Sequence, residues 1–143
     1  MQATAAVSAT PFSSRVPLVI DTSAWFRQWN GGVGERWEAT YEAACFASCP
    51  AAALEILRTA KDEPTFEALD RHLAALPQAP VTASVCRAAH GAMRELGARR
   101  RLPATDYLIA AAAAECGFGV LHADKHFDLL ATVLEFESVR LAE

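Results

Sequence analysis

Two short apolar runs in this chain each end at an aspartate, and this feature restricts the fold more than any other. The first run is VPLVI, residues 16–20, followed by Asp21, and the second is FGVLHA, residues 118–123, followed by Asp124. Neither run alternates apolar with polar residues, so both indicate parallel strands that are buried on both faces. In open α/β sheets ligand sites lie beyond the carboxyl ends of the strands, so both aspartates are expected at that edge.

Between and beyond these runs, the chain carries signals for helices. Polar residues 21–23 can cap a helix that starts at about Ala24. Pro103 opens and Gly117 closes a strongly helical segment, ATDYLIAAAAAEC. We also expect helices over 35–44 after a glycine-rich break, over 51–61 behind Pro50, over 64–76, from 82–84 to 96 and over 127–133, with a last strand near 138–141. Short strands that alternate with helices predict an α/β fold with a mostly parallel central sheet.

The length of 143 residues suits one domain, which we place at residues 16–143 behind a flexible tail of residues 1–15. The tail sequence, MQATAAVSATPFSSR, lacks the basic and apolar regions of a secretory signal. The longest wholly apolar stretch, Leu108–Ala114, is far shorter than the roughly 20 residues that cross a bilayer, so no membrane span is expected. Four cysteines, at 45, 49, 86 and 116, are spaced poorly for zinc and are interpreted as reduced thiols of a cytoplasmic protein.

The acidic residues carry the strongest chemical signal. Besides Asp21 and Asp124, Asp106 lies in the first turn of the Pro103 helix and Glu55 interrupts the apolar run AAALEIL. Each has a structural alternative: a helix cap for Asp21, a surface pair with Arg58 for Glu55, a helix-dipole charge for Asp106 and a turn for Asp124. Together they predict a cation site, because gathered carboxylates repel one another. Oxygen ligands favour Mg²⁺ or Mn²⁺ over zinc.

Four segments of the chain resemble a known family. They are VIDTSAW, CPAAALEIL, LPATDYLIAAAA and LHADKHFDLLA, and their order and spacing from about Val16 onward resemble the PIN domain. Within that family the likeness is greatest to VapC-type toxins of bacterial toxin–antitoxin systems. The resemblance implies a PIN-like three-layer domain, and it implies a metal-dependent endoribonuclease that is held in check by a small VapB-type antitoxin and is a homodimer.

The resemblance also implies the roles of particular residues. The acidic pocket would consist of Asp21, Glu55, Asp106 and Asp124, with Asp21, Asp106 and Asp124 holding Mg²⁺ or Mn²⁺. Thr22 and Ser23 match hydroxyl positions that would orient the attacking water.

One position departs from the family pattern: His126 stands where relatives often carry a second acidic residue. His126 and Asp128 are candidates for the outer coordination sphere of the metal. Their structural alternatives are a hydrogen-bond donor for His126 and a helix-start residue for Asp128.

A basic segment precedes the Asp106 helix. The net charge of −4 excludes nucleic-acid binding by bulk charge, so any contact with RNA needs a local patch. Arg99, Arg100 and Arg101 provide one and are predicted to bind the RNA backbone, the alternative being a solvated loop.

Two other functions are consistent with parts of this pattern. A catalytically silent PIN-like module that binds RNA or protein remains open, although such a module has no need for gathered carboxylates. A haloacid-dehalogenase-like phosphatase is discarded, because that chemistry needs an aspartate where this chain has Ser23.

Overall fold

The computed structural model describes residues 9–13, 15–28 and 33–141. Most of the predicted tail and two of the three glycines of the predicted break lie outside these ranges. The elements are β1 (Leu18–Ile20), α1 (Thr22–Arg27), α2 (Gly34–Glu42), β2 (Phe46–Ala47), α3 (Pro50–Leu57), α4 (Glu63–Ala74), α5 (Ala83–Leu96), the 3₁₀ turn η1 (Ala98–Arg100), α6 (Ala104–Cys116), β3 (Gly119–His122), α7 (Lys125–Leu130) and β4 (Glu137–Arg140).

The four strands form one sheet in the order β2-β1-β3-β4, and every pairing between them is parallel. Strands β1 and β3 lie at the centre, where Val19 pairs with Val120, and every residue of both strands is buried. The two apolar runs therefore form buried parallel strands, as predicted. Strand β2 was not predicted, because two residues carry no periodicity that a sequence pattern could reveal.

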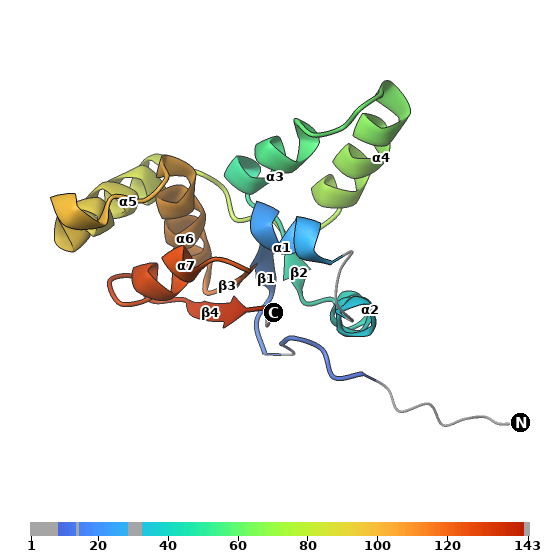
Figure 1. Ribbon diagram of the computed structural model, residues 1–143, viewed down its shortest axis with the longest axis horizontal. Coiled ribbons are helices and arrows are strands. Elements are labelled where there is room, and N and C mark those ends of the chain that lie inside the picture. Colours follow the sequence, from blue (N-terminus) through green and yellow to red (C-terminus); the bar gives the residue numbers. More distant parts are fainter. Residues whose placement is uncertain (1–8, 14, 29–32, 142–143) are drawn as a thin grey trace, which may run out of the picture.

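Helices cover both faces of the sheet, and alternate residues of the central strands point to opposite layers. Val19 and Val120 pack into a core built mainly from α5, α6 and α7. Leu18, Ile20 and Leu121 pack into a second core with residues of α1, α2 and α4. Figure 1 shows α5, α6 and α7 together on one side of the domain and α3 and α4 on the other. The predicted three-layer α/β fold is confirmed.

Helix α6 is the most buried helix of the domain and carries Asp106 in its first turn. Residues 109–113 are all buried, and four of these five side chains are methyl groups, which lets α5 and the sheet approach closely. The helix ends at Gly117, whose φ of 71° lies in the left-handed region that glycine adopts without strain. Within the described ranges, no helix is long and apolar enough to span a membrane.

Candidate active site

The carboxyl ends of β1 and β3 are joined by the side chain of Ser23. The backbone N–H of Asp21 donates to the carbonyl of Leu121 at 3.0 Å, which extends the strand pairing to the aspartate. The Ser23 hydroxyl donates to Asp21 Oδ2 at 2.5 Å and accepts from the backbone N–H of Ala123 at 2.9 Å. Residues 100 positions apart in sequence are thus fixed to each other beside the first aspartate.

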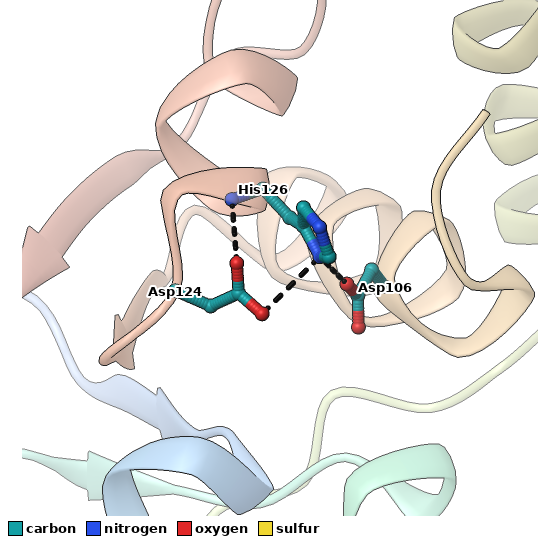
Figure 2. Close-up of side chains that lie close together, drawn as sticks. All are labelled: Asp106, Asp124 and His126. Carbon is teal, nitrogen blue, oxygen red and sulfur yellow. Dashed lines mark hydrogen bonds and ion pairs between the residues drawn. The ribbon is translucent and has the colours of Figure 1, made fainter. Parts of the chain in front are cut away.

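Asp106, Asp124 and His126 form a compact cluster that Figure 2 shows in close-up. His126 Nδ1 lies 2.9 Å from Asp106 Oδ2 and 3.2 Å from Asp124 Oδ2, so the ring stands between the two carboxylates. Asp124 is also the N-cap of α7 and accepts the backbone N–H of His126 at 3.0 Å. One potential ligand atom from each of the three residues lies within 4.8 Å of the other two.

Glu55 reaches the same edge of the sheet from α3. Its Oε1 accepts a hydrogen bond from the Thr22 hydroxyl at 3.1 Å, and its charge adds to the larger effect of burial in raising the pKa of Asp21. Burial raises the pKa of Asp106, and the charge of Asp21 adds to that effect. Each of the four carboxylates predicted from the sequence therefore lies near enough to at least one of the others to repel it. The alternative interpretation of Glu55 was a surface pair with Arg58. In the structure the hydrogen-bond partner of Glu55 is Thr22.

Burial and mutual repulsion disfavour the ionised form of the carboxylates at this edge. The pKa of Asp106 is raised to about 6, and burial is the main cause. The negative charges of Asp21 and Asp124 also raise this pKa, whereas the hydrogen bond from His126 lowers it. Burial also raises the pKa of Asp21, against the hydrogen bonds from Ser23. A cation would offset the repulsion. The carboxylate oxygens of this set are ligands that Mg²⁺ and Mn²⁺ accept, so the residues present fit such an ion.

Comparison with known proteins gives the family. The PIN domain family model matches residues 18–133, from β1 to just beyond α7. The chain belongs to the PIN-domain family. Ribonuclease VapC18 of Mycobacterium tuberculosis is 34% identical over 119 residues, which cover 80% of this chain and 87% of that protein. Ribonuclease VapC11 of the same organism is 35% identical over 132 residues, covering 85% of this chain and 96% of that protein.

A solved structure with the same fold is a member of the VapBC family of toxin–antitoxin systems, VapBC-5 from M. tuberculosis. Its TM-score with this chain is 0.63 at 21% sequence identity, and the match covers 88% of this chain and 99% of that one. The resemblance to VapC-type PIN domains that was drawn from four sequence segments is confirmed.

In this PIN domain the hydroxyls of Thr22 and Ser23 both donate to carboxylates, the first to Glu55 and the second to Asp21. Each hydroxyl proton is therefore committed, and each side chain holds an acidic partner in place. Their predicted role in orienting water stays a prediction, and it would have to use the oxygen lone pairs.

The structure separates the two residues that were candidates for the outer coordination sphere. His126 lies within the acidic cluster, whereas Asp128 accepts hydrogen bonds from Ser138 at 2.8 Å and Arg140 at 3.3 Å. Ser138 also contacts His122 Nε2 at 2.7 Å, and His122 Nδ1 accepts the backbone N–H of Asp124 at 3.2 Å.

This network links Asp128 to the backbone of Asp124 through the buried ring of His122. Burial lowers the pKa of His122, which favours the neutral ring that can accept at Nδ1 and donate at Nε2. The sequence pattern does not reveal these partners of His122, because Ser138 lies 16 positions away on β4.

The basic segment is fixed beside Asp106 by the next residue of α6. The buried Tyr107 hydroxyl donates to the carbonyl of Arg100 at 3.4 Å and accepts the backbone N–H of Leu102 at 3.3 Å. The side chains of the predicted RNA-binding residues Arg99, Arg100 and Arg101 are exposed. The turn that carries them therefore has a defined position next to the acidic edge.

Proposed function

We propose that this chain is a metal-dependent endoribonuclease and acts as the toxin of a toxin–antitoxin pair. The observation that carries the proposal is the convergence of Asp21, Asp106 and Asp124 at one edge of a PIN-domain sheet, with two of them buried and raised in pKa. Relatives that share a third of the sequence are named VapC ribonucleases, which supports cleavage of RNA as the reaction.

In this proposal Asp21, Asp106 and Asp124 hold Mg²⁺ or Mn²⁺ through carboxylate oxygens. When bound, such an ion supplies Lewis acidity, which polarises a phosphate and makes water a better nucleophile. His126 Nδ1 lies between Asp106 and Asp124, so in the metal-bound protein the ring would either be a ligand itself or turn away from this gap. We assign His126 to the outer coordination sphere.

The other residues of the pocket act on protons and on position. Glu55 faces Asp21 from α3, and we assign it to accept a proton from the attacking water. Thr22 holds the Glu55 carboxylate by its 3.1 Å hydrogen bond, and Ser23 holds Asp21 against the end of β3. Arg99, Arg100 and Arg101 supply positive charge for the RNA backbone beside these groups.

The test of the reaction is cleavage of single-stranded RNA by the purified protein. Activity is expected with Mg²⁺ or Mn²⁺ and is lost in excess EDTA. Asp21→Asn should reduce the rate by roughly a hundredfold or more, a typical loss for an essential electrostatic group. Asp70→Asn, which removes an exposed carboxylate of α4, is the matched control. Full activity in EDTA, or in Asp21→Asn, would contradict the metal mechanism.

The proposal also includes a partner. A small VapB-type antitoxin that inserts an arginine or lysine among the carboxylates would supply positive charge and exclude both metal and substrate. We further propose that the protein works as a homodimer, as the family resemblance implies.

The toxin role is tested by growth of cells that express the protein alone, with Asp21→Asn at matched soluble levels. Arrest by the wild type only, relieved by the partner, is expected. If neither form affects growth of a host close to the native one, the toxin role is wrong.

A further inference from the structure

A cationic pocket lies on the α5 side of the domain and shares no lining residue with the acidic cluster. His90, Met93 and Arg94 of α5 and Arg101 line a pocket of about 200 Å³. His90 and Arg94 are four positions apart, so they lie on one face of the helix, one turn from each other. The opposite face of α5 buries Val85, and the pocket residues His90, Arg94 and Arg101 are exposed.

The charge of this pocket is one-sided. No carboxylate lines it, and among the described residues neither Arg94 nor Arg101 takes part in an ion pair. Residues 87–101 contain five arginines and a single acidic residue, Glu95, whereas the whole chain has a net charge of −4. Glu95 neighbours Arg94 on α5 but does not line the pocket. The local excess of positive charge is therefore available to an anion.

The pocket is tied to the acidic edge by a short and anchored segment. Arg101 precedes Asp106 by five residues, which span at most about 18 Å when extended. Tyr107, the residue after Asp106, holds both sides of this segment through the Arg100 carbonyl and the Leu102 N–H. The backbone of Arg101 therefore lies within about 18 Å of that of Asp106, in a segment that Tyr107 holds in place.

We propose that this pocket binds one phosphate of the RNA strand at a fixed distance from the cleaved bond. The proposal rests on the proposed function and names a subsite for its substrate. Guanidinium groups bind phosphate through paired N–H donors, and Arg94 and Arg101 provide two such groups from different elements. His90 offers a third polar group. The volume is several times the roughly 30 Å³ of one water molecule, so a phosphate fits with solvent.

The arginines that line this pocket are not the same set as those predicted from the sequence to bind RNA. Arg99 and Arg100 stand on the neighbouring turn η1 and do not line the pocket. We therefore expect the affinity for RNA to depend more on Arg94 and Arg101 than on Arg99 and Arg100. All four are exposed arginines within eight positions of one another.

The test compares charge-matched variants in cleavage of a single-stranded RNA oligonucleotide. Arg94→Gln and Arg101→Gln should each raise KM about fivefold to tenfold and leave kcat within about twofold, because the contact is remote from the reacting bond. The double variant should lower the log–log salt slope of binding by about 0.7, the value for one phosphate contact on a single strand. Arg71→Gln, on exposed α4, removes the same charge elsewhere and should change neither.

A binding arm separates this inference from the proposed function. Fluorescence anisotropy of the labelled oligonucleotide is measured with the Asp106→Asn protein, with and without the two arginine substitutions, after circular dichroism confirms folding. Weaker binding by the arginine variants supports the pocket even if the wild-type protein cleaves no RNA. If the wild type cleaves RNA and the pocket variants keep its KM and salt slope, the pocket is wrong. The proposal would also be overturned if Arg99→Gln and Arg100→Gln changed KM and the salt slope as much as Arg94→Gln and Arg101→Gln do.

Discussion

Replacing Asp106 by asparagine should stabilise the metal-free protein at neutral and alkaline pH. Asp106 is 8% exposed, and its pKa of about 6 lies above the ordinary carboxyl value of 3.8. The folded state therefore holds the proton more tightly than the unfolded state, so ionisation above pH 6 destabilises the fold. Asparagine carries no charge at any pH, and it keeps an oxygen that can accept from His126.

The magnitude follows from the two pKa values. Their difference corresponds to about 3 kcal/mol in the free energy of unfolding at pH 8, at about 1.4 kcal/mol per pH unit. For a domain of this size about 1 kcal/mol moves Tm by about 4 °C, so Asp106→Asn should melt about 10 °C higher in EDTA. As the pH falls through 6 towards 4, the wild type protonates Asp106 and the difference should disappear.

The assay is a set of thermal melts in EDTA from pH 4 to pH 8, with Asp70→Asn as a control that removes an exposed carboxylate. Added Mg²⁺ should raise Tm of the wild type, because a ligand that binds only the folded state stabilises it, and should raise that of Asp106→Asn much less. The reasoning is refuted if Asp106→Asn melts at or below the wild-type temperature at pH 8, or if its advantage is the same at pH 4.

Two further substitutions test how the site is held. His122→Phe removes the hydrogen bonds that the buried ring makes with the Asp124 N–H and the Ser138 hydroxyl, so urea unfolding should show a loss of about 1–3 kcal/mol, and an unchanged midpoint would contradict the network. Ser23→Ala removes the hydroxyl that joins Asp21 to the end of β3, so stability should fall by about 1–3 kcal/mol and RNA cleavage should fall with it. Ser23→Thr keeps the hydroxyl and should restore most of the cleavage rate, while a Ser23→Ala protein as active as the wild type would show that the joint is unimportant.

The central strands were predictable because their environment leaves a mark on the sequence. Burial on both faces removes polar residues from VPLVI and FGVLHA, and the aspartate after each run stands where the strand meets solvent. Strand β2 has only two residues and shows no such pattern in the sequence. Its two residues pair with Leu18 and Val19 of β1, and the hydrogen bond from the Leu18 N–H to the Cys45 carbonyl at 2.8 Å belongs to the same pairing. Such a strand is set by tertiary contacts alone.

The same distinction holds at the site. The acidic residues could be selected from the sequence because their strand-end and first-turn positions put them at one edge. The position of the His126 ring between two carboxylates could not be predicted from the sequence, because it depends on the side-chain rotamer as well as on the backbone. The contact of Ser23 with Ala123 spans 100 positions and needs both strands in register. The roles assigned to these residues in catalysis remain predictions.

The position of the metal ion tests the central claim most directly. Crystals of the protein soaked in Mn²⁺ would locate the ion by its anomalous scattering, independently of any assay of activity. We expect one peak at coordination distance from carboxylate oxygens of Asp106 and Asp124, at the edge shared with Asp21, and no peak there in crystals of Asp106→Asn. A fully loaded wild-type crystal with its Mn²⁺ elsewhere, and none among these carboxylates, would contradict the account.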